Sequence, residues 1–271
     1  MRPLEPPPRP GLLLSFDFDG TMHHPGDTPS VHPSLFEQIR AMRRHHDAVW
    51  GINTGRSMNH VIEGLIESRF PFVPDWVVAR EREIWFPNKF GRWIGKEDWN
   101  KACLKDHKRL FRKTRKLLKT VRREIEERTG ATWIEQPGDP AALRATTNEE
   151  MDWIVERIRS HAVSQPLLHW QRNTIWLRFS HRDYHKGSAL QELGRHYGIT
   201  TAAIFAIGDS HNDHDMLMPA VAGRIACPAN AVDPIKEQII SHNGFVSPSP
   251  NSRGCVEALR HFYKPNNQTN G

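Results

Sequence analysis

Hydrophobic residues in this chain occur mainly as short, nearly continuous runs that alternate with longer amphipathic stretches. Runs of this kind occupy residues 12–16, 48–53, 76–79, 202–207 and 224–226. Short, nearly continuous apolar runs are typical of strands that are buried on both faces of a parallel sheet. Apolar residues recur every three or four positions in the stretches between them, which predicts helices over residues 33–46, 57–68 and 185–197. The alternation predicts an α/β fold with a Rossmann-like, doubly wound parallel sheet.

The pattern changes between residues 84 and 182. Two hairpin-like pairs of apolar segments, at 84–94 and 167–180, enclose strands at 131–135 and 141–146 and helices at 98–128 and 148–161. Because the strand–helix alternation resumes afterwards, this segment is predicted to be an inserted α+β domain. The expected organisation is a discontinuous core of residues 1–83 and 183–271, with an insertion of residues 84–182.

Polar side chains follow three of the predicted core strands at the points where the strands end. Asp17 and Asp19 follow the first run, Thr54 follows the second, and Asp209 and Asp213 follow the run at 202–207. The carboxyl ends of parallel strands meet at one edge of a sheet, where ligands usually bind. A turn or helix cap is the competing interpretation of the first acidic pair taken alone. If these carboxylates share one site, a cation is needed to offset the repulsion between their negative charges. Carboxylate oxygens without histidine or cysteine favour Mg²⁺ over zinc as that cation.

Four segments resemble, in order, the four motifs of the haloacid dehalogenase-like hydrolase superfamily. They are Asp17-Phe-Asp19-Gly-Thr21, Thr54-Gly-Arg56, Lys186-Gly-Ser-Ala-Leu190 and Gly208-Asp209-Ser-His-Asn212-Asp213. The α+β insertion between the second and third motifs resembles the cap domain of the Cof-like, sugar-phosphatase branch. Ala229-Asn230-Ala231, followed by Lys236, also resembles that branch.

The resemblance implies a Mg²⁺-dependent phosphatase acting on a small phosphorylated metabolite, with a sugar or polyol phosphate expected. Asp17 would be the nucleophile that forms an aspartyl-phosphate, and Asp19 would be the general acid and base. The implied phosphate-binding residues are Thr54, Gly55, Lys186 and Asn212. The implied metal ligands are Asp17, Asp19 through its main-chain carbonyl, Asp209 and Asp213. A phosphotransferase or phosphomutase of the same superfamily is the alternative enzyme.

The sequence departs from that branch just after the third strand, where an Asn-Gly pair is usual. Here the chain reads Ala79-Arg80-Glu81-Arg82-Glu83. Arg56, Arg80 and Arg172 are the candidate substrate-binding residues, and Arg144 and His169 are further candidates.

The composition adds a second class of hypothesis. The net charge is +6, and residues 98–128 form a strongly basic predicted helix. Such a helix could bind nucleic acid beside a vestigial site, but charge runs on amphipathic helices are usually solvated, and no known nucleic-acid-binding module accompanies this one. Nucleic acid is therefore not expected as a partner.

The cysteine and hydropathy patterns indicate a cytoplasmic protein. The three cysteines are widely spaced and odd in number, which favours free thiols in a reducing compartment. No segment approaches the roughly 20 apolar residues that a membrane span requires, and the first apolar run is too short for a signal peptide. Nothing in the sequence indicates a particular oligomeric state.

Overall fold

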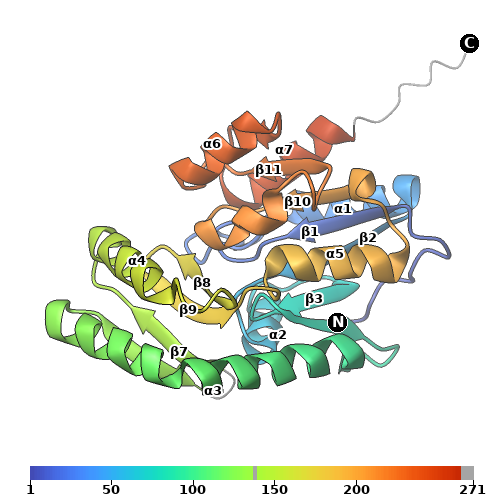
Figure 1. The fold of residues 1–271 in the computed structure, drawn as a ribbon. Coiled ribbons are helices and arrows are strands. Elements are labelled where there is room, and N and C mark those ends of the chain that lie inside the picture. The colour runs from blue at the N-terminus through green and yellow to red at the C-terminus, as the bar shows by residue number, and fades with distance from the viewer. Residues whose placement is uncertain (137–138, 264–271) are drawn as a thin grey trace, which may run out of the picture. The chain divides into compact units, whose positions relative to one another are not determined.

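The computed structural model describes residues 1–136 and 139–263 of the chain (Figure 1). The chain forms two compact units, a discontinuous core of residues 1–96 and 186–271 and an insertion of residues 97–185. Each unit has a sheet and a hydrophobic core of its own.

The core unit is built on an eight-stranded sheet in the order β12-β11-β10-β1-β2-β3-β4-β5. The pairings from β12 to β3 are parallel, and β4 and β5 join as antiparallel strands. The strands are β1 (Leu12–Phe16), β2 (Ala48–Asn53), β3 (Trp76–Ala79), β4 (Glu83–Pro87), β5 (Trp93–Gly95), β10 (Ile204–Ile207), β11 (Arg224–Cys227) and β12 (Phe245–Val246).

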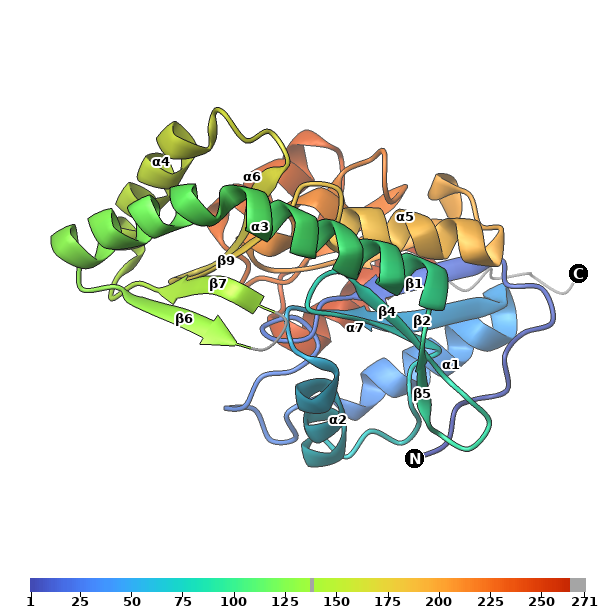
Figure 2. The ribbon, with the colours of Figure 1, turned by 60° about the horizontal axis from the view of Figure 1, so that its bottom comes forward.

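Helices lie on both faces of this sheet, which confirms the predicted doubly wound α/β fold. The buried residues of α1 and α7 share one hydrophobic cluster with Leu12, Leu14 and Phe16, whereas α5 lies on the opposite side of the sheet (Figures 1 and 2). The helices of the core are α1 (Pro33–His46), α2 (Met58–Glu67), α5 (Lys186–Tyr197), α6 (Asp233–Ser241) and α7 (Asn251–Phe262), with 3₁₀ turns η1 (Thr201–Ala203) and η2 (His211–Leu217).

Local sequence explains how these elements begin. All five residues of β1 are buried, as expected for a central strand covered on both faces. Pro33 occupies the first turn of α1, where its missing N–H costs nothing. The Ser57 side chain accepts a hydrogen bond from the His60 N–H and caps α2.

The packing of β2 against β3 depends on Gly51. A Cβ atom at Gly51 would lie 2.2 Å from the fully buried ring of Trp76 on the paired strand. We expect Gly51→Ala to lower the free energy of unfolding by about 1–3 kcal/mol, the usual cost of overpacking a core, in urea denaturation.

Gly26→Ala is the control for this prediction. A Cβ atom at Gly26 would have the ring of the half-exposed His24 as its nearest neighbour, so the change should stay within about 0.5 kcal/mol. Equal urea midpoints for Gly51→Ala and the wild type would contradict the prediction.

The insertion consists of a four-stranded antiparallel sheet and two helices. Its sheet order is β6-β7-β9-β8. The buried residues of α3 and α4 share one cluster with those of the strands. The elements are α3 (Glu97–Arg128), β6 (Thr132–Gln136), β7 (Asp139–Arg144), α4 (Asn148–Ala162), β8 (Leu168–Asn173) and β9 (Trp176–His181).

The first hairpin of the expected insertion belongs instead to the core sheet. Strand β4 pairs with β3 through Ala79↔Glu83 and Val77↔Trp85, and β5 extends the same sheet. Trp85 and Trp93 therefore pack against the core cluster. The units divide near residues 96 and 186, whereas the sequence indicated 83 and 183.

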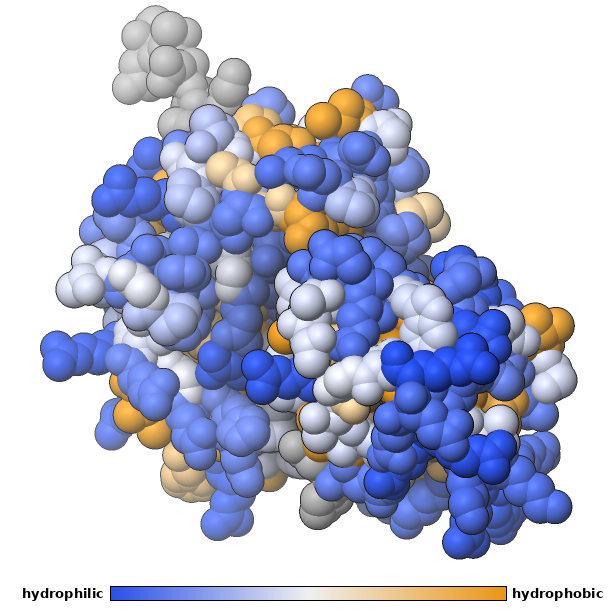
Figure 3. Space-filling view, turned by 90° about the vertical axis from the view of Figure 1, so that its left-hand side faces the viewer, coloured by the Kyte–Doolittle hydropathy of each residue, from blue (hydrophilic) through white to orange (hydrophobic). Residues whose placement is uncertain are grey.

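The second difference follows β10. The sequence indicated a helix through Met218, but residues 211–217 form a 3₁₀ helix, and the strand predicted over 202–207 begins at Ile204 after a 3₁₀ turn. None of the three cysteines forms a disulfide, as predicted, and all three are buried. In the described part of the chain no helix has the length and hydropathy to cross a membrane, and hydrophilic residues dominate the face shown in Figure 3.

Candidate active site

The candidate active site lies beyond the carboxyl ends of β1, β2 and β10. Phe16 is in register with Ile52 on one side and with Ile207 on the other, so the residues that follow these three strands emerge together. Carboxylate oxygens of Asp17, Asp209 and Asp213 lie within 4.8 Å of one another. The structure thus brings together three of the predicted acids, which we call the acidic triad.

Lys186 supplies the positive charge of this site. The lysine is the first residue of α5 and is completely buried. Its Nζ atom donates to Asp17 Oδ1 and to Asp213 Oδ1, each at 2.6 Å. The Asn53 amide donates to the Lys186 carbonyl at 3.0 Å, which fixes the start of α5 against β2.

One buried lysine does not balance the buried carboxylates of Asp17 and Asp213 together with the partly buried one of Asp209. Burial and the neighbouring Asp213 raise the pKa of Asp17, although Lys186 opposes them. Burial and Asp213 likewise raise the pKa of Asp209 to about 6. Burial alone would lower the pKa of Lys186, but Asp17 and Asp213 raise it, so the lysine is fully charged. The site has an excess of negative charge that a further cation would relieve.

The donor set fits Mg²⁺. Its groups are oxygens of a compact, buried cluster of carboxylates, which is the ligand type that Mg²⁺ prefers. Asp213 is already engaged, because Oδ1 binds Lys186 and Oδ2 accepts the backbone N–H groups of Asp209 and Ser210, each at 2.9 Å. Asp213 therefore shapes the loop that presents Asp209.

The turn after β1 is packed tightly against Asp209. Gly20 has a φ of +77°, and a Cβ atom there would lie 2.5 Å from Asp209 Oδ2, so only glycine fits. Thr21 Oγ1 donates to Asp209 Oδ1 at 2.8 Å. The Asn230 amide donates to the Gly20 carbonyl at 2.7 Å, which gives the Ala229-Asn230-Ala231 segment a structural role beside the site.

The side chain of Asp19 does not join the acidic triad. Its carboxylate accepts a bidentate pair of hydrogen bonds from Arg56, at 2.7 Å from Nε and 2.5 Å from Nη2. The guanidinium also lies 4.7 Å above the ring of Phe18. Although partial burial opposes ionisation, His23 and Arg56 lower the pKa of Asp19 to about 2. Arg56, a candidate for substrate binding, is therefore engaged by the carboxylate of Asp19.

The predicted phosphate-binding residues lie around the same edge. Thr54 is buried, and its Oγ1 accepts from the Arg56 N–H at 3.2 Å. The Asn212 amide donates to Glu81 Oε1 at 2.8 Å. The same Glu81 oxygen would lie 3.3 Å from a Cβ atom on Gly55. The sequence marks Glu81 only as part of an unusual segment, and the structure adds it to the site.

The other two arginine candidates make local contacts. Arg80 pairs with Glu83 at 3.4 Å within the β3–β4 turn. Arg172 in the insertion donates to the Thr174 carbonyl at 2.9 Å and pairs with Asp152. These contacts give each side chain a structural role in its own unit.

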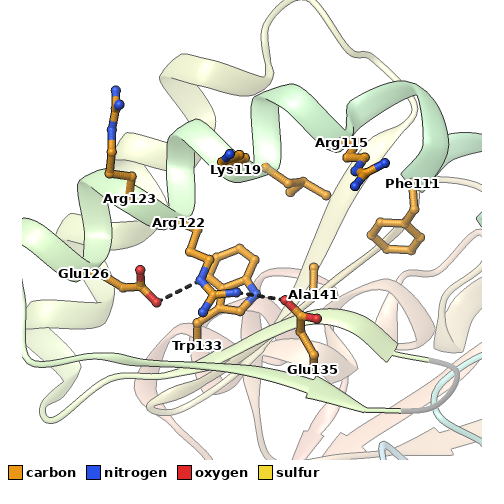
Figure 4. Close-up of a pocket in the computed structure, with 10 residues that line it drawn as sticks. Phe111, Arg115, Lys119, Arg122, Arg123, Glu126, Trp133, Glu135 and Ala141 are labelled. Atoms are coloured by element: carbon orange, nitrogen blue, oxygen red, sulfur yellow. Dashed lines mark hydrogen bonds and ion pairs between the residues drawn. The ribbon is translucent and has the colours of Figure 1, made fainter.

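The basic helix α3 carries its charges on the solvent side. Its buried positions recur at helical spacing. The basic residues of the other face are exposed: Lys105, Lys108, Arg109, Arg112, Lys113, Arg115, Lys116 and Lys119. A groove of about 730 Å³ lies between α3 and β6, lined by side chains that include Arg115, Lys119 and Trp133 (Figure 4). Arg122 in this groove binds Glu126 at 2.8 Å and Glu135 at 2.9 Å. These features fit a solvated helix face, the alternative that the sequence favoured.

Comparison with known families decides the assignment. The model of the haloacid dehalogenase-like hydrolase family matches residues 91–259, which is more than half of the chain. The chain belongs to this family. The matched segment contains Lys186, Asp209 and Asp213, so the motif-based prediction of the superfamily is confirmed.

Among the relatives of this haloacid dehalogenase-like hydrolase are two named phosphatases. A phosphoglycolate phosphatase of Archaeoglobus fulgidus is 42% identical over 78 residues, 29% of this chain and 32% of the relative. A 5-amino-6-(5-phospho-D-ribitylamino)uracil phosphatase of Bacillus subtilis is 44% identical over 71 residues, 26% of this chain and 23% of the relative. The matched segments thus span about a third or less of these relatives.

Solved structures extend the similarity of this haloacid dehalogenase-like hydrolase to nearly the whole chain. The sucrose-phosphatase of Synechocystis, solved with sucrose and phosphate, superimposes with a TM-score of 0.70 over 93% of this chain and 98% of that one. Its identity of 18% shows a shared fold.

Proposed function

We propose that this protein is a Mg²⁺-dependent phosphatase that hydrolyses a small phosphorylated metabolite, such as a sugar or polyol phosphate, through an aspartyl-phosphate intermediate. The observation that supports it best is the position of Asp17, at the end of the central strand, against Lys186 and beside the carboxylates of Asp209 and Asp213.

In the first step, an oxygen of Asp17 attacks phosphorus and the bond to the ester oxygen breaks. The leaving alkoxide takes a proton from Asp19. In the second step, Asp19 accepts a proton from water as that water attacks the aspartyl-phosphate, which releases phosphate and regenerates Asp17. The hydrogen bonds from Arg56 keep Asp19 ionised, which is the form that the second step needs. These hydrogen bonds must weaken before Asp19 can be protonated and act as an acid in the first step.

The phosphoryl group would be held by Thr54, Gly55, Lys186 and Asn212. Lys186 is fixed by two carboxylates, so its charge is in place before the substrate arrives and needs little reorganisation. The ion would be held by Asp17, Asp209 and the main-chain carbonyl of Asp19, with Asp213 beside them. When bound, Mg²⁺ would offset the negative charge of the triad and of the phosphoryl oxygens.

The names of the relatives support phosphoryl chemistry of this kind. The two curated relatives are named as phosphatases of small phosphorylated metabolites, and the sucrose-phosphatase shares the fold. The ion pairs of α3 and the absence of a known nucleic-acid-binding module favour an enzyme over a nucleic-acid-binding protein.

The test is phosphate release from a panel of sugar and polyol phosphates by the purified protein. We expect release with Mg²⁺ and loss of release with excess chelator. Transfer of the phosphoryl group to an added polyol in place of water would identify a phosphotransferase. A panel without turnover in the presence of Mg²⁺ would refute the proposed activity.

Binding of Mg²⁺ can be measured apart from turnover. Titration with Mg²⁺ should raise the melting temperature. At a hundredfold excess of Mg²⁺ over Kd, the free energy of unfolding should increase by about 2.7 kcal/mol. Asp209→Asn should reduce this thermal shift strongly, because it removes one of three adjacent carboxylates.

Asp183→Asn is the control for Asp209→Asn, because its side chain is 68% exposed in the insertion. The control should show the full thermal shift. A thermal shift that survives Asp209→Asn unchanged would remove Asp209 from the proposed metal site.

A further inference from the structure

The turn between β3 and β4 holds two consecutive non-glycine residues in the left-handed region. Arg80 has a φ of 51° and Glu81 a φ of 64°. Side chains with a Cβ atom disfavour this region, so such a turn is retained only where its surroundings compensate. The Arg80 N–H donates to the Arg56 carbonyl and the Glu81 N–H to the Thr54 carbonyl, each at 2.8 Å. The strained turn is thereby attached to the proposed phosphate-binding segment.

The side chain of Glu81 points toward the proposed phosphate-binding residues Asn212 and Gly55. The residue is only 4% exposed. Its Oε1 atom accepts the Asn212 amide at 2.8 Å and lies against Gly55. Its carboxylate also adds to the charges that raise the pKa of Lys186. Glu81 therefore contacts two of the four residues proposed to hold the phosphoryl group.

The second oxygen of Glu81 is buried without a partner. Among the residues that the structure describes, none donates a hydrogen bond to Oε2. A buried polar atom without a partner is unfavourable and calls for an explanation. A carboxylate oxygen that is ionised can only accept hydrogen bonds, so the missing group is a donor.

We propose that Glu81 determines substrate specificity, a proposal that rests on the phosphatase function above. Glu81 Oε2 accepts a hydrogen bond from a hydroxyl or ammonium group that the substrate carries next to its phosphate ester. A carboxylate at that position would meet the negative charge of Glu81 and offer no donor, so acidic phosphate esters are rejected. The strained backbone is the cost of placing this acid where a glycine would sit without strain.

Three two-carbon phosphate esters test this proposal, because they differ only in the group beside the ester. Ethylene glycol monophosphate carries a hydroxyl, phosphoethanolamine an ammonium and 2-phosphoglycolate a carboxylate. Each is assayed with Mg²⁺ for kcat/KM and as a competitor of p-nitrophenyl phosphate hydrolysis, so that an inhibition constant is obtained even where turnover is slow. The wild type should prefer the first two over 2-phosphoglycolate by at least tenfold.

Two substitutions separate the effect of the Glu81 charge on specificity from an effect on folding. Glu81→Gln keeps the shape and should reduce the preference about tenfold, mainly through better use of 2-phosphoglycolate. Glu81→Gly should also lose the preference, and its melting temperature should equal or exceed that of the wild type because glycine relieves the positive φ. Glu83→Gln, two residues away and paired with Arg80, is the control and should keep the wild-type preference.

The outcomes distinguish this proposal from the function on which it rests. Equal use of the three esters by the wild type, or an unchanged preference in Glu81→Gln, would overturn the role of Glu81 while leaving the phosphatase intact. Absence of phosphate release from all four compounds in the presence of Mg²⁺ would count against the phosphatase function itself.

Discussion

Asp17→Asn is expected to lower phosphate release by at least a thousandfold while leaving the protein folded. An amide cannot attack phosphorus to form the aspartyl-phosphate, and losses of this size follow the removal of a nucleophile. The substitution is nearly isosteric at a residue that is only 4% exposed. It also removes one of three mutually repelling carboxylates, so the melting temperature in chelator should not fall sharply. Phosphate release and thermal unfolding measure the two effects.

Asp233→Asn is the matched control for Asp17→Asn. The Asp233 side chain is 89% exposed in the first turn of α6 and pairs only weakly with Lys236, at 3.7 Å. Its activity and melting temperature should equal those of the wild type. Turnover by Asp17→Asn above a few per cent of the wild-type rate would exclude Asp17 as the nucleophile.

Lys186→Met should give the largest loss of stability among these substitutions. The lysine is fully buried between Asp17 and Asp213, and its removal leaves two buried carboxylates without their cation. Breaking a buried ion pair by removing one partner costs about 3–5 kcal/mol, which corresponds to a fall in melting temperature on the order of 10 °C. The measurement is made in chelator, so that no metal ion replaces the lysine. Phosphate release should be lost as well.

A double substitution identifies the cause of this loss. In the Asp17→Asn background, Lys186→Met leaves one buried carboxylate fewer without a partner, so its cost should be smaller than in the wild type. Lys236→Met is the control, because Lys236 forms an ion pair with an exposed aspartate at 3.7 Å, and it should change stability by less than about 0.5 kcal/mol. Equal costs of Lys186→Met in both backgrounds would show that the lysine and Asp17 are not coupled.

The core of the fold could be predicted because its strands have a strong sequence signal. A strand buried on both faces favours apolar residues at nearly every position, as in Leu12–Phe16, where only Ser15 is polar, and such a run differs clearly from an amphipathic helix. The acidic triad could be predicted for a related reason, since parallel strands bring their carboxyl ends to one edge. Asp17 and Asp209 were therefore expected together although they are far apart in sequence.

The parts of the fold and of the site that could not be predicted depend on which of several possible segments or side chains a residue contacts in the folded chain. The hairpin of Glu83–Pro87 and Trp93–Gly95 is only partly buried, so its hydrophobic pattern does not indicate which of the two sheets it joins. The pairing of Arg56 with Asp19, 37 residues away, depends on the distance between two turns. Left-handed turns usually contain glycine or asparagine, so a turn made by Arg80 and Glu81 has no sequence signal.

The central position of β1 has a consequence for the synthesis of this protein. The strand pairs on one side with β2, which follows soon, and on the other with β10. Thr21 and Asp209, which hydrogen-bond across this junction, are 188 residues apart, a distance that a ribosome covers in roughly 10 to 40 seconds. During that interval one edge of a largely apolar strand has no partner in the nascent chain. We therefore expect the amino-terminal part of the protein to be prone to aggregation until β10 has been translated.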